Sequence, residues 1–394
     1  MDYFEESLLL HKRLKGKILI SPKIDVQTKE QLSLVYSPGV AEPCMEIYRN
    51  PESVWDYTIK NNMVAVVSDG SAVLGLGNIG ARAAIPVMEG KALLFKRFAN
   101  IDAFPICIDS QDVDKIVETV RLISPVFGGI NLEDIAAPRS FEVEARLQDL
   151  GIPVFHDDQH GTAIVVLAAL LNAVKVVDKK MSELRVVING AGAAGIAIAR
   201  LLKGVDYTGA AHSVEVADII ICDTKGILQA DRQDLNDSKR DALTYTNRHN
   251  VKGSVQDALR DADVFIGVSV GDLLTADDIR TMAQDAIILA LANPTPEIMP
   301  DEAYKGGAAI VGTGRSDLPN QVNNVLGFPG VFRGALDARA KCISPAMKMA
   351  AAFAIAECVA KPGKDLIIPP SLDEQVAWRV AAAVKAAALA EKVA

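Results

Sequence analysis

Two pairs of acidic residues each follow an apolar segment. Glu133 and Asp134 come after FGGINL, and Asp157 and Asp158 come after IPVFH. If these segments are strands joined by one helical crossover, their carboxyl ends lie at the same edge of a parallel sheet, where neighbouring strands are about 4.8 Å apart. Four carboxylates so close would repel one another and raise some of their pKa values. A hard divalent cation removes this conflict, because Mg²⁺ and Mn²⁺ prefer oxygen ligands.

An alternative needs no metal, because acids that follow strands also serve as helix N-caps. Two such pairs at adjoining strand ends favour a metal site over this alternative. His156 and His160 flank the second pair. Because oxygen-rich surroundings favour Mg²⁺ or Mn²⁺ over zinc, we interpret both histidines as supporting residues that do not bind the ion.

The pattern G-x-G-x-x-G occurs twice, as GLGNIG at 75–80 and as GAGAAG at 190–195. The second copy directly follows the strand-like RVVIN and leads into the helix-like IAIARLL. In that arrangement, backbone N–H groups at a helix N-terminus bind a dinucleotide pyrophosphate. The next strand ends in Asp223, which can accept a hydrogen bond from a ribose 2′-OH. The predicted coenzyme-binding residues are Gly190, Gly192, Ala193, Ala194, Gly195 and Asp223.

Asp223 also bears on the choice of coenzyme. Its charge would repel a 2′-phosphate, which favours NAD over NADP, although Lys225 nearby could soften that repulsion, so NADP stays open. Gly190 and Asp223 are 33 residues apart, more than the usual spacing of roughly 20. We assign the extra length to a surface loop at 204–218.

The copy at 75–80 has a different context. Its candidate strand, MVAVVSD, is followed by DGSAV, which we interpret as a turn and a returning strand, and the segment GKALLFKRFA precedes the next strand. This does not fit a minimal β-α-β unit. We therefore expect this copy to let the backbone pass close to a substrate or a neighbouring helix, without binding a nucleotide.

The surrounding elements predict the fold. From residue 101, strand-like and helix-like segments alternate as β-α-β-α-β, which indicates parallel strands joined by right-handed crossovers. The segment 162–177 is apolar on nearly every side, so it is expected to be a buried helix linking two domains, with Thr162 as its cap. A second alternating series, from LRVVING to AAIVGTG, predicts a doubly wound domain. Two amphipathic helices follow it.

The sequence thus predicts an α/β protein of 394 residues with two domains. An N-terminal α/β domain at 1–160 binds substrate and metal, and a Rossmann-like, doubly wound domain at 161–340 binds NAD(P). The C-terminal helices at 341–394 pack on either domain or form a subunit interface.

Composition excludes several partners. A formal charge of −9 leaves no basic field for nucleic acid or anionic lipid. The five cysteines lack the C-x-x-C spacing of a zinc or redox pair. The N-terminus has acids where a secretory signal has bases, and charges interrupt the alanine-rich C-terminal stretches. We expect a cytoplasmic protein without nucleic-acid or membrane partners.

Taken together, motifs spread from residue 36 to residue 336 resemble malic enzymes of the short prokaryotic type. The matching segments are YSPGVAEPC (36–44), SDGSAVLGLGNIG (68–80), EGKALLFK (89–96), NLEDI (131–135), FHDDQHGTA (155–163), INGAGAAG (188–195), ICDTKGIL (221–228), ANPTPEI (292–298) and GRSDLPNQVNNVLGFPGVFRGAL (314–336). The resemblance implies oxidative decarboxylation of L-malate to pyruvate and CO₂ with reduction of NAD(P), dependence on Mg²⁺ or Mn²⁺, and a homodimer.

The same resemblance implies roles for individual residues. Tyr36 matches the general acid and Lys91 the general base that contacts substrate. Asp157 matches an acid beside the metal that is not a usual ligand. The matching metal ligands are Glu133, Asp134 and Asp158, and the asparagines matching those near substrate and nicotinamide are Asn293 and Asn324. Whether Tyr36 serves its own site or a partner's stays open.

One departure concerns substrate binding. Long eukaryotic members of the family have an arginine shortly after the SDG-like turn that binds a malate carboxylate, whereas this chain continues with Ser71 and Ala72. Other groups must therefore bind the carboxylates, and the sequence does not identify them.

The proposed base must also lose its proton. A lysine can act as a base only if its pKa falls from about 10.4 toward about 7 or 8, and burial beside a divalent cation would lower it. Lys91, in the apolar run ALLF, fits better than Lys96. The alternatives are a metal-independent two-domain NAD(P) amino-acid or 2-hydroxy-acid dehydrogenase and a non-catalytic NAD-sensing module.

Overall fold

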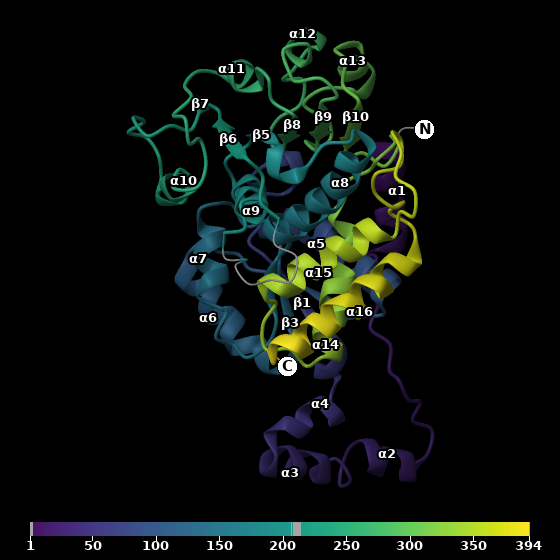
Figure 1. The fold of residues 1–394 in the computed structure, drawn as a ribbon. Helices are drawn as coiled ribbons and strands as arrows, with labels where there is room; N and C mark the ends of the chain where they lie inside the picture. The colour runs from purple at the N-terminus through teal and green to yellow at the C-terminus, as the bar shows by residue number, and fades with distance from the viewer. Residues whose placement is uncertain (1–2, 206, 208–213, 394) are drawn as a thin grey trace.

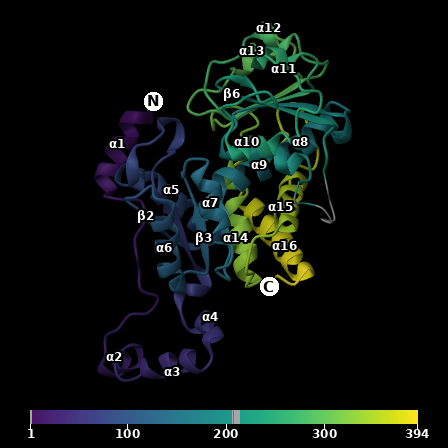
Figure 2. The same ribbon diagram turned by 90° about the vertical axis from the view of Figure 1, so that its left-hand side faces the viewer.

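The computed structural model describes residues 3–205, 207 and 214–393 (Figure 1). Two sheets form the centres of two lobes, which are seen apart in Figure 2. The helices of the described residues are α1 (Tyr3–Leu14), α2 (Lys29–Val35), α3 (Ala41–Arg49), α4 (Val54–Tyr57), α5 (Gly80–Ala99), α6 (Val113–Ile123), α7 (Arg139–Ala145), α8 (Thr162–Val176), α9 (Ala193–Leu202), α10 (Asp237–Ala242), α11 (Val255–Leu259), α12 (Ala276–Ile279), α13 (Pro300–Lys305), α14 (Phe328–Asp337), α15 (Pro345–Glu357) and α16 (Glu374–Glu391).

The first sheet is parallel and has the order β2-β1-β3-β4. Its strands are β1 (Met63–Ser68), β2 (Asp102–Cys107), β3 (Gly129–Leu132) and β4 (Val154–His156). The expected alternation is present, but β1 lies between β2 and β3, so the first two strands of the predicted series are not neighbours. Strands β3 and β4 are neighbours, which brings the ends that carry the two acid pairs together.

Helix α5 connects β1 to β2 and positions Lys91. Its buried face repeats at intervals of three and four residues and consists of Ala84, Met88, Lys91, Phe95 and Phe98, among others. Lys91 therefore occupies a core position. The returning strand expected at DGSAV is wrong: the described residues 69–79 form a loop with a short 3₁₀ turn at Leu74–Leu76 and one isolated bridge, between Val73 and Gly77.

The second sheet confirms the predicted doubly wound fold. Its order is β10-β9-β8-β5-β6-β7, and all neighbours are parallel except β6 and β7. The strands are β5 (Arg185–Asn189), β6 (Asp218–Asp223), β7 (Gly226–Ile227), β8 (Val264–Gly267), β9 (Ile287–Ala290) and β10 (Ile310–Thr313). Much of the predicted surface loop at 204–218 lies outside the described residues.

Helix α8 leads from the first lobe into the second. A π-helical turn at Asp157–Gly161 runs into it without a break, so its N-cap is Gly161, and the cap predicted at Thr162 is wrong. By length and composition, the continuous helix Asp157–Val176 is the one described helix that could cross a membrane, yet 72% of its apolar window is buried inside the protein. This burial is typical of a core helix.

The C-terminal helices contact both lobes. Helices α14 and α16 pack on each other and on α5, and α15 packs on α8 and α16. The buried ring of Phe328 on α14 meets Phe95 of α5 edge to face, with ring centroids 4.7 Å apart. These helices thus support the helix that carries Lys91. The domain boundaries at residues 160 and 340 stay predictions.

Helices α1 to α3 have no buried residue. Figures 1 and 2 show α2 and α3 projecting from the body, and we call residues 24–50 the arm. Large apolar side chains of the arm are exposed, including Leu32, Leu34, Tyr36 and Tyr48. Patches of this kind usually mark an interaction surface.

Candidate active site

Three of the predicted acids converge at the carboxyl edge of the first sheet. Glu133 and Asp134 follow β3, and Asp158 lies in the π-helical turn after β4. One carboxylate oxygen from each lies within 4.8 Å of the others. The backbone N–H of Asp134 donates to Asp158 Oδ2 at 2.8 Å, which joins the two strand ends. This all-oxygen donor set fits a hard divalent cation.

Lys91 contacts two of the acids at this edge. Its Nζ is 2.6 Å from Asp157 Oδ2 and 2.8 Å from Glu133 Oε1, and it lies 4.1 Å from the centre of the Phe328 ring. Asn324, in the short 3₁₀ turn Asn324–Leu326, donates to the same oxygen of Asp157. Asp157 therefore faces the lysine, while Asp158 joins the three-acid group.

The pKa of Lys91 is shifted in the opposite direction to the one that the sequence predicts for a general base. Burial lowers the pKa of Lys91, but Asp157 and Glu133 raise it by more, so it stands above its ordinary value. Burial in turn raises the pKa of Asp157 to about 7, against the lowering effect of Lys91. Burial also raises the pKa values of Glu133 and Asp158. In this arrangement Lys91 keeps its proton for as long as both carboxylates face it.

Two histidines support the turn. His156 is fully buried, neither ring nitrogen has a hydrogen-bond partner among the described residues, and burial lowers its pKa to about 4, which favours the neutral ring. The ring of His160 lies 2.9 Å from Glu144, a buried acid on α7 that also accepts the backbone N–H of His156. His160 is thus paired with Glu144.

Ser71 makes structural contacts in the loop after β1. Its hydroxyl donates to Asp69 Oδ1 at 2.5 Å and accepts from the backbone N–H of Ala136 at 2.9 Å. The N–H of Ala72 donates to the carbonyl of Asp134 at 3.0 Å. The loop after β1 is thereby fixed to the loop that follows β3.

The structure does not bring Tyr36 to Lys91 within one chain. Tyr36 follows the last residue of α2 and is 68% exposed. Lys91 is 8% exposed inside the first lobe. In both views, α2 lies well away from α5 (Figures 1 and 2).

The second glycine motif joins strand and helix closely. The N–H of Gly190 donates to the carbonyl of Cys222, which holds the end of β5 against β6. A Cβ at Gly195 would stand 1.8 Å from the Gly190 carbonyl oxygen, whereas a Cβ at Gly192 would meet nothing within 4 Å. Ala193 and Ala194 begin α9. An open backbone at a helix N-terminus fits a dinucleotide pyrophosphate.

The first glycine motif approaches the second lobe. A Cβ at Gly75 would lie 2.5 Å from the carbonyl oxygen of Asn293, on the loop after β9. The expected close passage of backbone is therefore present, with the Asn293 loop as the neighbour. This contact places the predicted substrate and coenzyme residue Asn293 beside the loop that leads to α5.

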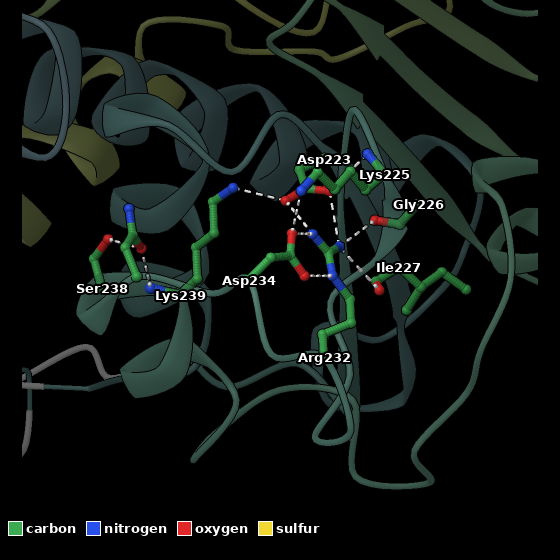
Figure 3. Close-up of polar contacts among 9 residues, drawn as sticks. Asp223, Lys225, Gly226, Ile227, Arg232, Asp234, Ser238 and Lys239 are labelled. Atoms are coloured by element: carbon green, nitrogen blue, oxygen red, sulfur yellow. Dashed lines mark hydrogen bonds and ion pairs between the residues drawn. The ribbon is translucent and has the colours of Figure 1, made fainter.

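Asp223 is not a free acid (Figure 3). Both of its oxygens accept from Arg232, at 2.8 and 2.9 Å, and Lys239 Nζ lies 2.6 Å from Oδ2. In the sequence, Lys225 is the basic residue nearest to Asp223. Arg232 and Lys239 lie further along the chain, in a loop and at α10, so only the fold shows that they reach Asp223.

Comparison with known proteins identifies the relatives of both lobes. The model of the malic enzyme N-terminal domain matches residues 15–148, and that of the malic enzyme NAD-binding domain matches residues 159–389. The chain is 56% identical over 398 residues to the bifunctional malic/malolactic enzyme of Bacillus subtilis (strain 168), covering 100% of this chain and 95% of that protein. It is 51% identical over 389 residues to the NAD-dependent malic enzyme of Geobacillus stearothermophilus, covering 98% of this chain and 78% of that protein.

A solved structure extends the similarity to three dimensions. The crystal structure of malic enzyme from Pyrococcus horikoshii Ot3 matches with a TM-score of 0.91 and 49% identity, covering 98% of this chain and 92% of that chain. The two-domain arrangement is therefore common to both.

Proposed function

The chain belongs to the malic enzyme family, and from that premise we propose that it converts L-malate to pyruvate and CO₂ with reduction of NAD or NADP, in a reaction that requires Mg²⁺ or Mn²⁺. The observation that carries this proposal is the convergence of buried Lys91 and Asp157 on a three-acid group, whose member Glu133 contacts the lysine directly. Hydride transfer alone would need no such group.

Glu133, Asp134 and Asp158 would hold the divalent ion, which supplies Lewis-acid stabilisation for the enolate charge left when CO₂ departs. Lys91 takes the proton of the malate hydroxyl. Glu133 and Asp157 both raise the pKa of Lys91 and so stabilise its ammonium form. Lys91 can therefore act as a base only when the Glu133 carboxylate binds the divalent ion and no longer faces the lysine. Asp157, which accepts hydrogen bonds from both Lys91 and Asn324, fixes the position of the amine.

The metal requirement separates this proposal from a metal-independent dehydrogenase and from a non-catalytic NAD sensor. We expect malate-dependent formation of reduced nicotinamide, measured by its absorbance, to stop when a chelator is added and to return when Mn²⁺ is added. Asp158→Asn should raise the Mn²⁺ concentration for half-maximal rate by about tenfold or more. The matched control is Asp149→Asn, an exposed acid paired with Arg121. Malate oxidation that persists in chelator would refute the proposal.

Tyr36, the acid that the resemblance implies, is exposed and does not reach Lys91 within one chain. We propose that Tyr36 protonates the enolate carbon in the site of a partner subunit within a homodimer. Two observations support this. The arm has no buried residue in its helices α2 and α3, although it carries exposed leucines and tyrosines, and Lys91 has no tyrosine among its contacts in the described residues.

A complementation experiment tests this arrangement. Tyr36→Phe and Lys91→Ala each inactivate a homodimer, but a mixed dimer keeps one intact site if Tyr36 acts across the interface. Random exchange of subunits should therefore restore about a quarter of the wild-type activity. If Tyr36 acts within its own chain, mixing restores none. A mixture of Lys91→Ala with itself, treated identically, gives the background.

A further inference from the structure

We propose that Glu297 is a positioning residue for the nicotinamide end of the coenzyme, because its buried carboxylate joins the loop after β8 to the loop after β9. It acts through these two loops. This inference rests on the proposed use of a nicotinamide dinucleotide, and it names a residue to which the proposed function gives no role.

The two oxygens of Glu297 hold two different loops. Oε1 accepts the backbone N–H of Ser269, in the loop after β8, at 2.9 Å. Oε2 accepts the backbone N–H of Ala292, in the loop after β9, at 3.0 Å. A glutamine could satisfy only one of these N–H groups, because its amide nitrogen donates hydrogen bonds and does not accept them. The bridge between the loops therefore needs a carboxylate.

Glu297 is fully buried without a counter-ion. No lysine, arginine or histidine forms an ion pair with it in the part of the chain that the structure describes. Burial raises the pKa of its carboxyl, and the backbone N–H groups of Ser269 and Ala292 act against that rise. A buried carboxylate costs solvation energy that an apolar side chain of the same size would not. The residue type therefore indicates a role that depends on where the two loops lie.

Further contacts press the same two loops together. The backbone N–H of Leu273 donates to the carbonyl of Glu297 at 2.8 Å. A Cβ at Gly267 would lie 2.2 Å from the carboxyl carbon of Glu297, and a Cβ at Gly271 would lie 2.6 Å from the carbonyl oxygen of Thr295. The glycines of one loop thus leave room for the other loop and for the glutamate.

The joined loops lie on the side of the sheet that suits nicotinamide. Strand β5, which leads into the glycine turn, lies between β6 and β8, and β9 follows β8. In doubly wound folds the dinucleotide crosses the carboxyl ends of the strands, and its adenosine ribose lies toward the acid that ends the second strand. With Asp223 on β6 as that acid, the nicotinamide end lies toward β8 and β9.

The loop after β9 also reaches the first lobe. A Cβ at Gly75 would lie 2.5 Å from the carbonyl oxygen of Asn293, which directly follows Ala292. The loops that Glu297 joins therefore connect the coenzyme half of the molecule to the lobe that carries Lys91. A shift of these loops would change the position of nicotinamide relative to malate.

The glycine turn itself is held by other contacts. The backbone N–H of Gly190 donates to the carbonyl of Cys222 at 2.9 Å, and the backbone N–H of Val268 donates to the carbonyl of Asn189 at 2.9 Å. These bonds join strand ends and do not involve Glu297. A change at Glu297 should therefore move the nicotinamide end of the site and leave the adenosine end in place.

A comparison of two ligands tests this inference. Titration calorimetry of the full chain with NADH measures the whole coenzyme, and titration with ADP-ribose measures the part that lacks nicotinamide. Glu297→Gln should weaken NADH by about tenfold and ADP-ribose by less than about twofold. Malate turnover should fall by about tenfold to a hundredfold, because the reacting atoms are misplaced. If the wild-type chain binds NADPH more tightly than NADH, NADPH and 2′-phospho-ADP-ribose replace the pair.

Glu302→Gln is the matched control. Glu302, on α13 in the same lobe, also accepts a backbone N–H, that of Ala276, but its side chain is 42% exposed. This variant should change neither affinity. Equal losses of NADH and ADP-ribose in Glu297→Gln would indicate a general structural role and overturn the inference, and so would unchanged binding of both ligands.

Gly271→Ala moves the same loops without altering the glutamate. Its Cβ would lie 2.6 Å from the carbonyl oxygen of Thr295, so the two loops must separate. We expect the same selective loss of NADH, and this variant decides the question if thermal unfolding shows that Glu297→Gln does not fold. Unchanged NADH affinity in Gly271→Ala would overturn the inference.

The wild-type chain separates this inference from the proposed function. If it binds neither NADH nor NADPH, the coenzyme site is wrong, and this inference is wrong with it. If it binds NADH but does not oxidise malate, the proposed reaction is wrong, whereas the comparison of NADH with ADP-ribose still decides the role of Glu297.

Discussion

GLGNIG and GAGAAG have the same glycine spacing but different surroundings. In the second motif, β5 ends at Asn189 and α9 begins at Ala193, so the turn is short and Gly192 faces open space. In the first, β1 ends at Ser68 and α5 begins at Gly80, and the loop between them carries Gly75 against Asn293. The distance between strand end and helix start, more than the glycine pattern, distinguishes a phosphate turn from a packing loop.

The two motifs also differ in the helix that follows. Helix α9 directs its N-terminus toward the coenzyme cradle, whereas α5 contributes a residue from its middle, Lys91, to the acidic edge. The first motif therefore belongs to the proposed chemistry and the second to the proposed coenzyme binding. Substitutions in or near the first motif should therefore affect turnover and leave coenzyme affinity unchanged, and substitutions in the second motif should weaken coenzyme binding.

Lys91→Ala should give the largest effect. Removing a general base costs roughly a hundredfold to ten-thousandfold in turnover, so malate oxidation should nearly disappear while the affinity for ADP-ribose is unchanged. Steady-state rates and calorimetry measure the two quantities. Lys96→Ala is the control on the same helix, because Lys96 is exposed and paired with Asp102. Activity of Lys91→Ala within tenfold of the parent would exclude it as the base.

Gly192→Ala should act only through the coenzyme. Its backbone has φ −95°, which alanine adopts without strain, and the added Cβ meets no protein atom within 4 Å. The methyl group would occupy space that the pyrophosphate needs, so we expect about tenfold weaker binding of ADP-ribose and an unchanged melting temperature. Unchanged affinity would place the pyrophosphate elsewhere.

Gly75→Ala should disturb the contact between the lobes. The new Cβ would lie 2.5 Å from the carbonyl oxygen of Asn293, so one of the two loops must move. We expect a loss of about 1 to 3 kcal/mol in the free energy of unfolding and a several-fold lower turnover, with little change in ADP-ribose affinity. Denaturant unfolding and steady-state kinetics provide the measurements. An unaltered turnover would show that the position of Asn293 does not matter to the reaction.

Much of the fold follows from sequence pattern, because buried parallel strands such as VVIN (186–189) and IILA (287–290) are short, apolar and separated by helices. The acids that follow β3 and β4 could be predicted to lie close together, because the carboxyl ends of parallel strands meet at one edge of a sheet. The position of β1 could not be predicted, since pairing order within a sheet leaves no local signal. The state of Asp223 could not be predicted either, because Arg232 and Lys239 reach it only through the fold of a loop and α10.

Gly77→Ala is the counterpart of Gly192→Ala, since each glycine occupies the third position of its six-residue motif. A Cβ at either position would meet nothing within 4 Å. Gly77, however, has φ +74° and ψ −140°, a conformation that strains any residue with a Cβ by about 1 to 3 kcal/mol. We expect lower stability in thermal unfolding, with ADP-ribose affinity unchanged. The two variants should thus give opposite results: one loses affinity and keeps stability, and the other loses stability and keeps affinity. Weaker coenzyme binding by Gly77→Ala in the folded protein would mean that GLGNIG contacts the nucleotide after all.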